Sequence, residues 1–305
     1  MSVPFVLAPM AELSHRALRE LIESFGGADE YFTEMISAGT LISGGPFEAW
    51  YTDSGPCPER LVYQLVGGDA DQLLRAVILL DKRECLGIDI NMGCSAPAIT
   101  RTGAGVRWMA DIDRAADLIR RLRPKTHRRL SVKLRTGLTD DFEYLARFCR
   151  RLEEEGIDLI TLHPRTAKEK FKRSARWDYI SCLKKELHIQ VAGNGDIASS
   201  AEMLRRGEEC DAVMIGRLAV RRPWVFAEAK MVTDTIFGIF ETGLRFLELL
   251  SRYQPPEFHI SRSRRFFSYF CDNLKWGNHV KNLLNRETSL SGVERVWRNA
   301  CKLDN

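Results

Sequence analysis

The stretch VAGNGDIASSAEML (191–204) shows the local pattern from which we predict the fold. A short apolar run leads into a turn with two glycines, and the residues after the turn have the spacing of an amphipathic helix. The glycines fit G-x-G-x-x-A, a spacing found in dinucleotide-binding folds. We reject that interpretation, because the pattern lies late in the chain rather than in an opening strand–helix–strand unit.

The same order of apolar run, turn and amphipathic helix repeats through the first 230 residues. The apolar runs do not alternate strictly, which is typical of parallel strands buried on both faces. We predict strands at 5–8, 31–35, 61–66, 87–91, 130–135, 159–163, 189–193 and 212–216. We predict helices at 15–25, 69–82, 113–122, 142–155, 177–186, 199–206 and 222–233, and an irregular loop with a short helix at 36–58. Eight such units favour a (β/α)₈ TIM barrel, in which the chemistry lies at the carboxyl ends of the strands.

The strand pattern ends near residue 233, and helical spacing follows at 236–253, 260–284 and 291–301. We therefore expect an α/β protein with a barrel at 1–235 and a small all-helical domain at 236–305. The chain has 305 residues, of which 45% are apolar, so a large core is possible. Residues 236–305 hold 11 Lys and Arg against 7 Asp and Glu, which is the whole net charge of +4. Such a segment suits nucleic-acid binding.

The cysteines and the apolar runs exclude several classes of protein. The eight cysteines include no C-x-x-C pair, which argues against zinc ribbons and thioredoxin-like sites, and we expect no metal. No apolar run approaches 18 residues and no secretory signal is recognised, so we expect no membrane span and a cytoplasmic location with reduced thiols.

Polar residues follow the predicted strands at the barrel end that carries chemistry. Asn194, Gly195 and Asp196 follow the seventh strand, and Gly216 with Arg217 follows the eighth. The turns after these two strands form the usual phosphate site of a barrel. Lys133 lies in the otherwise apolar stretch SVKLRTG (131–137), where a charge is costly unless an anion or ligand pairs with it.

Three further side chains can serve a cofactor or a substrate. Gln64, at the end of the third strand, can hydrogen-bond to the edge of a flavin or of a base. His163, at the end of the sixth strand, can donate to a ring carbonyl or to a phosphate. Cys94 lies in INMGCSAP (90–97), directly after the fourth strand. A loop thiol over a barrel mouth can act as a nucleophile or as a proton donor.

In these motifs the sequence resembles the tRNA-dihydrouridine synthase family. The matching stretches are APM (8–10), VYQLVG (62–67), DINMGC (89–94), RTGAG (101–105), SVKLRTG (131–137), LHPRT (162–166), ARWDYI (175–180), NGDI (194–197) and IGR (215–217). The resemblance implies an FMN-binding barrel followed by a helical tRNA-binding domain. It implies that particular uridines in tRNA are reduced to 5,6-dihydrouridine and that NADPH re-reduces the flavin. Separately, we expect a monomer, although the sequence does not determine the oligomeric state.

The resemblance also implies a role for each matching residue. Against the isoalloxazine it places Pro9, Met10 and Ala11. Hydrogen bonds to the flavin would come from Gln64, Lys133 and His163. The ribityl chain and phosphate would be bound by Asn194, Gly195, Asp196, Gly216 and Arg217. The uracil edge would be read by Asn91, the proton would come from Cys94, and further substrate contacts would come from Arg101 and Arg165.

The sequence departs from the family pattern after the cysteine, where Ser95 replaces the usual proline and predicts a less rigid loop. Arg107 and Trp108 replace small and aliphatic residues, and we expect them to alter the fit of the substrate. In the tail we expect Arg262, Arg264, Arg265, Lys275 and Lys281 to bind phosphates, whereas most of the aromatic residues between them, such as Phe266 and Phe267, suit a helical core. The basic loop at 168–176 is a second candidate for this role.

Two other functions stay open. One is a flavin barrel that reduces a small molecule of the dihydroorotate or enoate type, although such a substrate needs no basic tail. The other is a catalytically silent tRNA-binding protein, although the presence of Cys94, Lys133 and Asn91 argues against it.

Overall fold

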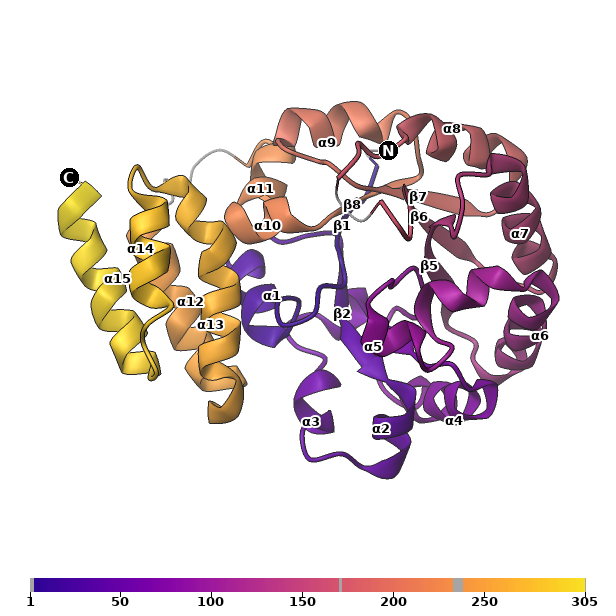
Figure 1. The fold of residues 1–305 in the computed structure, drawn as a ribbon, viewed down its shortest axis with the longest axis horizontal. Coiled ribbons are helices and arrows are strands. Elements are labelled where there is room, and N and C mark those ends of the chain that lie inside the picture. The colour runs from indigo at the N-terminus through magenta and orange to yellow at the C-terminus, as the bar shows by residue number, and fades with distance from the viewer. Residues whose placement is uncertain (1–2, 170–171, 233–237, 305) are drawn as a thin grey trace.

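The computed structural model describes residues 3–169, 172–232 and 238–304. Eight parallel strands pair in chain order and close into a barrel, with helices around it (Figure 1), which confirms the predicted fold class. The strands are β1 (Phe5–Leu7), β2 (Glu30–Ser37), β3 (Leu61–Val66), β4 (Gly87–Met92), β5 (Arg129–Gly137), β6 (Leu159–Thr166), β7 (Gln190–Asn194) and β8 (Ala212–Ile215). Each predicted strand overlaps one of these, and most ends differ by one to three residues.

The helices that follow the strands begin at residues suited to capping. The long ones are α1 (Arg16–Glu23), α4 (Ala70–Asp81), α6 (Ile112–Leu122), α7 (Phe142–Glu154), α8 (Trp177–Glu186) and α9 (Ser200–Gly207). The side chains at the N-caps of α4, α6, α7 and α9 accept a hydrogen bond from the backbone amide three residues further on; they are Asp69, Asp111, Asp141 and Ser199. Each such cap stabilises a helix by about 1 kcal/mol.

Short helices occupy several loops. They are α2 (Ala38–Ser43), α3 (Glu48–Tyr51), α5 (Pro97–Thr100), α10 (Arg217–Arg221) and α11 (Val225–Ala229), together with the 3₁₀ turns η1 (Pro58–Arg60), η2 (Gly105–Ala110) and η3 (Arg123–Lys125). The helix predicted at 222–233 is present only as α11, which begins two residues after Pro223; residue 233 itself lies outside the described residues.

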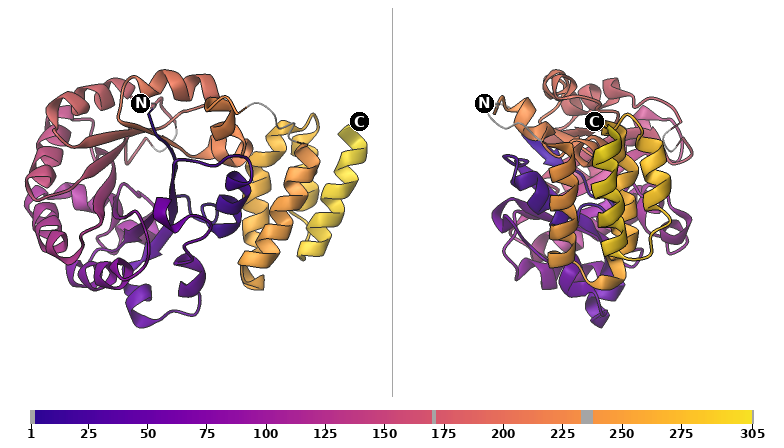
Figure 2. Two further views of the ribbon diagram at one scale, coloured as in Figure 1. Left: turned by 180° about the vertical axis from the view of Figure 1, so that it is seen from behind. Right: turned by 90° about the vertical axis from the view of Figure 1, so that its left-hand side faces the viewer.

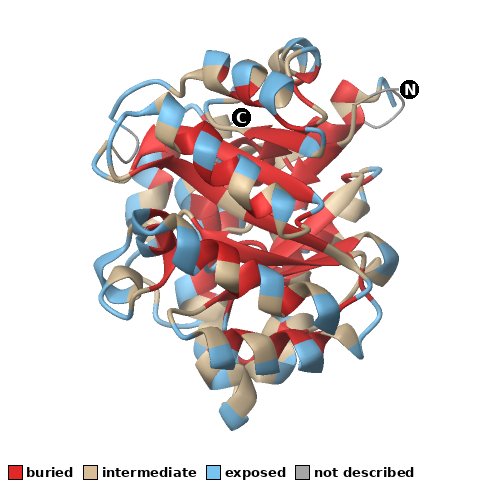
Figure 3. Cartoon of the chain, turned by 90° about the vertical axis from the view of Figure 1, so that its right-hand side faces the viewer, coloured by how far each residue is buried: buried red, intermediate tan, exposed pale blue. Residues whose placement is uncertain are grey.

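The buried apolar side chains form two clusters. Val6, Phe32, Val62, Leu159 and Met214 belong to a small cluster of strand residues. A larger cluster includes residues from both strands and outer helices and continues into the C-terminal helices. Figure 3 shows that the strands are buried along nearly their whole length, whereas the helices expose one face.

The C-terminal segment is a bundle of helices beside the barrel (Figures 1 and 2). It consists of α12 (Ile239–Tyr253), α13 (Pro256–Phe270), the 3₁₀ turn η4 (Cys271–Asn273), α14 (Gly277–Leu284) and α15 (Leu290–Asp304). The continuous helix predicted at 260–284 is wrong. A tight turn divides it at Gly277, where a Cβ atom would lie 2.0 Å from the carbonyl oxygen of Cys271. The predicted domain boundary at 235/236 lies outside the described residues.

The bundle meets the barrel through contacts of α12 with α1 and of α13 with α10. Arg262 of α13 is buried at this junction, and its Nη2 lies 2.8 Å from Oε2 of Glu34 in β2. The prediction that Arg262 binds phosphates is therefore wrong, because its charge is used inside the protein. Phe266 and Phe267 are buried beside it, which confirms their assignment to a helical core.

In the described part of the chain, no helix is long and apolar enough to cross a membrane.

Candidate active site

A cavity of about 260 Å³ opens at the carboxyl ends of the strands. Residues at the ends of β1, β2, β4, β5, β6, β7 and β8 line it. From the predicted set it includes Pro9, Met10, Asn91, Cys94, Lys133, His163, Arg165, Asn194, Gly195, Asp196, Gly216 and Arg217. The structure therefore brings together residues that are up to 208 positions apart in the sequence.

Three predicted residues lie outside the cavity lining. Ala11 is exposed. Gln64 is fully buried and bonded to neighbouring strands. Arg101 is exposed at the end of α5, and its Nε donates to the carbonyl oxygen of Pro97 at 3.1 Å.

Six further residues line the cavity and were not predicted as site residues: Ala8, Met35, Gly93, Arg135, Ile197 and Met214. Arg135 could have been found from its spacing, because it lies two residues after Lys133 and successive residues of a strand face opposite sides.

Lys133 places a positive charge in the floor of the cavity. Its Nζ donates to Oδ1 of Asn194 at 3.0 Å, and Nδ2 of Asn194 donates to the carbonyl oxygen of Met214 at 2.8 Å. Burial lowers the pKa of Lys133 to about 8, and Arg135 acts in the same direction. Lys133 is therefore protonated at neutral pH and close to its titration range.

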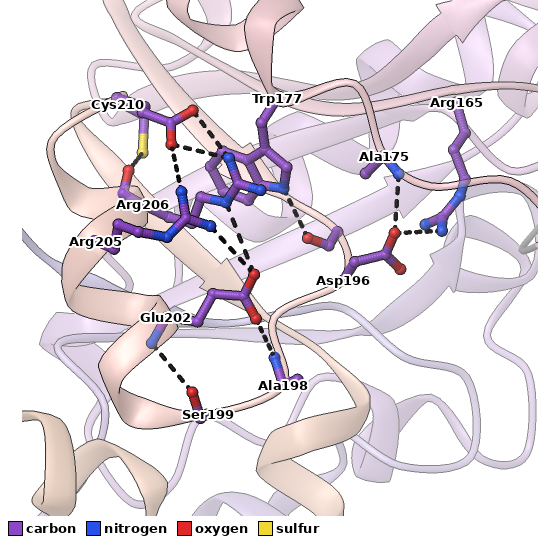
Figure 4. A network of polar contacts seen from close by, with 12 residues as sticks. Arg165, Ala175, Trp177, Asp196, Ala198, Ser199, Glu202, Arg205, Arg206 and Cys210 are labelled. Atoms are coloured by element: carbon purple, nitrogen blue, oxygen red, sulfur yellow. Dashed lines mark hydrogen bonds and ion pairs between the residues drawn. The ribbon is translucent and has the colours of Figure 1, made fainter.

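A second group of contacts joins the loops after β6 and β7 (Figure 4). Nη1 of Arg165 lies 3.0 Å from Nε2 of His163. Nη2 of the same guanidinium donates to Oδ2 of Asp196 at 2.5 Å. Burial lowers the pKa of His163 to about 2, with Lys133 next in effect, so the ring is neutral. Because a guanidinium only donates, Nε2 of His163 accepts this bond and the ring proton lies on Nδ1.

Asp196 holds these loops together. Its Oδ2 also accepts a hydrogen bond from the backbone amide of Ala175 at 2.8 Å (Figure 4). Burial opposes ionisation of this carboxyl group, but Arg165 and the Ala175 amide hold its pKa below the ordinary value. The carboxylate therefore ties the turn after β7 to the segment before α8.

Gly195 is required by the close packing of this turn. Its φ is +129°, and a Cβ atom there would lie 2.9 Å from Cδ2 of His163. Its carbonyl oxygen accepts a hydrogen bond from Nε1 of Trp177 at 2.9 Å (Figure 4). A larger residue would displace the imidazole from the cavity wall.

The backbone of Cys94 is bonded on both sides. Its amide donates to Oδ1 of Asn91 at 2.9 Å, and its carbonyl oxygen accepts from the amide of Val106 at 2.9 Å. Gly105 permits the second contact, because a Cβ atom there would lie 2.3 Å from the Cys94 oxygen. These two backbone hydrogen bonds therefore fix Cys94 in place, although Ser95 replaces the proline expected after it.

Trp108 does not act as expected from the sequence. It is 1% exposed, and its Nε1 donates to the carbonyl oxygen of Gly67 at 2.8 Å. Trp108 therefore belongs to the core and lies outside the cavity lining. Within the described residues, no group of three His, Cys, Asp or Glu side chains could hold a metal ion.

A cavity that combines apolar and charged side chains at the carboxyl ends of the strands lies where barrel enzymes place their active sites. The family model for dihydrouridine synthase matches residues 6–300. The chain is 34% identical over 256 residues to a probable tRNA-dihydrouridine synthase of Aquifex aeolicus, covering 81% of this chain and 78% of that protein. It is 25% identical over 311 residues to tRNA-dihydrouridine synthase B of Pseudomonas syringae pv. tomato, covering 97% and 92%. The chain therefore belongs to the dihydrouridine synthase family.

Among solved structures, histamine dehydrogenase from Rhizobium sp. 4-9 is similar in fold. The TM-score is 0.55 with 11% sequence identity, over 81% of this chain and 49% of that one.

Proposed function

We propose that this protein is an FMN-dependent tRNA-dihydrouridine synthase that uses NADPH to re-reduce its flavin. The family membership supports the reaction, which reduces the C5–C6 double bond of a uridine. The observation that carries the proposal is that Cys94 and Lys133 line one cavity together with the residues after β7 and β8.

The cavity residues fit a flavin phosphate and its ring. Gly216 leaves open space, because a Cβ atom there would meet nothing nearer than Sδ of Met10 at 3.7 Å. Arg217 follows Gly216 and supplies a positive charge for a phosphate. Lys133 would balance negative charge on the reduced ring system. When bound, the flavin supplies the hydride that adds to C6 of the uracil.

The chain's own contribution to the chemistry is a proton. Addition of a hydride to C6 leaves an electron pair and negative charge shared between C5 and O4. Cys94 then gives the proton of its thiol to C5, so that one hydride and one proton complete dihydrouridine. The uridine must leave its stack to reach this depth, so base extrusion is expected.

A groove beside the cavity provides a place for the RNA backbone. It shares Asp196, Ile197 and Arg217 with the cavity and continues past Arg221 of α10 to Tyr269 of α13. The guanidinium of Arg265 lies 5.7 Å from the centre of the Tyr269 ring. Asp272, which also lines the groove, is paired with Lys281 at 2.5 Å. Asp196, the other acidic residue of the lining, is likewise paired with a cation outside it, Arg165. With Arg165 and Lys281 counted, positive charge exceeds negative charge here.

A second groove lies on the helical bundle and is lined mainly by α12 and α15. Its arginines and glutamates are equal in number; they are Arg245, Arg252, Arg298, Glu241, Glu248 and Glu294. A groove with equal numbers of positive and negative side chains attracts phosphates only weakly. We therefore place the RNA on the first groove.

Replacing Arg221 and Arg265 by glutamine is expected to weaken tRNA binding and to reduce its salt dependence. Each lost phosphate contact lowers the slope of log K against log salt by roughly 0.7 to 0.9. The measurement is tRNA binding at several salt concentrations, with the flavin content expected to stay unchanged. Arg245→Gln with Arg298→Gln in the balanced groove is the matched control, and equal losses in both pairs would contradict the placement.

The affinity for FMN is expected to fall as the pH rises above about 8 and to be constant below it. The empty site loses the proton of Lys133 near pH 8, whereas anionic groups of the flavin raise the pKa of this lysine in the complex. Flavin titrations at several pH values measure this effect. Lys133→Met should bind FMN more weakly and lose the dependence; a variant that keeps the wild-type pH profile would exclude Lys133 as its source.

The function itself is tested by following the flavin. The purified protein should be yellow, NADPH should bleach it, and tRNA should restore the colour while dihydrouridine appears in the RNA. Restoration by a small enone or by orotate but not by tRNA would favour a small-molecule oxidoreductase. A protein that binds tRNA without flavin would be a silent binding protein.

A further inference from the structure

A chain of connected hydrogen bonds begins at Asp89 of β4, which is fully buried. Its Oδ1 accepts from Oγ of Ser131 at 2.7 Å, and its Oδ2 accepts from Nε2 of Gln64 at 2.8 Å. Gln64 and Ser131 are the residues paired with Asp89 on β3 and β5. The closed sheet therefore fixes all three side chains at one level of the barrel.

The bonds continue upward to the catalytic loop. Oε1 of Gln64 accepts from Nδ2 of Asn91 at 3.0 Å. Oδ1 of Asn91 then accepts from the amides of Gly93 at 3.2 Å and Cys94 at 2.9 Å. Asn91 thus uses its carbonyl oxygen to hold the backbone on which the thiol is carried.

The order of donors and acceptors follows from the carboxylate. An ionised carboxylate only accepts hydrogen bonds, so Gln64 must turn its NH₂ group toward Asp89 and its oxygen toward Asn91. Asn91 must in turn direct its NH₂ group to Gln64, which leaves its oxygen for the two backbone amides. The orientation of both amides is therefore set from both ends, by Asp89 below and by the backbone amides of Gly93 and Cys94 above.

Arg135 holds the same segment from the other side. Its Nε donates to the carbonyl oxygen of Gly93 at 3.0 Å, and it lines the cavity close to Cys94. Gly93 is closely packed here, since a Cβ atom would lie 3.2 Å from the carbonyl carbon of Leu134. Both the amide and the carbonyl group of Gly93 are thus bonded to side chains of the barrel.

We propose that Asp89, Gln64, Asn91 and Arg135 are positioning residues that hold the Gly93–Cys94 segment so that its thiol meets C5 of the uracil. This inference rests on the proposed function. It gives Asn91 a role different from the reading of the uracil edge that the family resemblance implies.

Asp89→Asn is the sharpest test, because Asp89 lies outside the cavity lining and can act only through its neighbours. An amide at position 89 has one acceptor atom where the carboxylate has two, so it can no longer accept from both Ser131 and Gln64 in the same way. We expect slower reoxidation of the reduced flavin by saturating tRNA, since a misplacement of about 1 Å can lower a rate about a hundredfold. We also expect a changed rate of Cys94 alkylation by iodoacetamide, measured by peptide mass spectrometry. The Asp89 charge raises the pKa of Lys133, so these measurements are made with FMN in excess. With the site saturated, flavin reduction by NADPH and tRNA affinity should stay unchanged.

The exposed Asp113→Asn is the matched control and should leave all of these quantities unchanged. If Asp89→Asn also leaves reoxidation and alkylation unchanged, the inference is overturned, whereas the proposed function stands as long as tRNA reoxidises the wild-type flavin.

Asn91→Ala and Arg135→Lys keep the inference testable if Asp89→Asn does not fold. We expect both to slow reoxidation at saturating tRNA and to change Cys94 alkylation. A raised KM for tRNA with an unchanged maximal rate and unchanged alkylation in Asn91→Ala would show that Asn91 reads the base, and would overturn the positioning role.

Discussion

Replacement of Cys94 by alanine is expected to remove nearly all turnover on tRNA while the flavin stays bound. The thiol lines the cavity, but its backbone is held by Asn91 and Val106, so alanine leaves the loop in place. A positioned general acid contributes a factor of about 10² to 10⁴ to a rate. The measurement is single-turnover reoxidation of reduced flavin by tRNA, with reduction by NADPH followed separately and expected to be unchanged.

Cys182→Ser is the matched control, because this thiol is exposed and lies far along the chain from the cavity residues of β4. It should turn over at the wild-type rate. If Cys94→Ala also turns over at that rate, Cys94 is not the acid.

The sequence predicted the barrel because each strand shows its own local pattern. Runs such as 61–66 and 159–163 are apolar without alternation, and burial of all their residues in β3 and β6 explains why. Lys133 could be predicted as a site residue for a related reason, since a single charge in such a run is conspicuous. Arg135 was not predicted because it begins the RTG motif (135–137), which resembles a polar strand end.

Hydrogen-bond partners could not be predicted in the same way. The sequence places Gln64 and Asn91 at strand ends, but the atoms that bond them come from β3, β4 and the segment after β4. Whether an amide faces a cofactor or a neighbouring strand depends on the register of the closed sheet. Arg262 shows the same limit, because its partner Glu34 lies 228 positions earlier in the chain. A basic and aromatic pattern alone does not distinguish such a residue from a phosphate-binding one.

Arg262→Met is expected to cause a large loss of stability at neutral pH. Removing one partner of a buried ion pair costs about 3 to 5 kcal/mol, because the other charge is left buried. Glu34 would keep the amide of Glu12, which donates to its Oε1 at 2.6 Å, and the more distant charge of Arg19. Urea unfolding of the two proteins measures the difference. Arg245→Met, which breaks the exposed pair with Glu248, should change stability by about 1 kcal/mol or less.

The dependence of this loss on pH identifies Glu34 as its cause. Burial already raises the pKa of Glu34, and Arg262 opposes that effect, so removal of Arg262 raises the pKa further. A carboxyl group whose pKa is higher in the folded than in the unfolded state destabilises the fold above that pKa and ceases to do so when protonated. The deficit of Arg262→Met should therefore shrink as the pH falls. Adding Glu34→Gln to Arg262→Met should recover much of the stability at neutral pH. If neither low pH nor this second substitution reduces the loss of stability, the unpaired charge of Glu34 is not its cause. Lost packing of Arg262 against Phe258 would then be responsible.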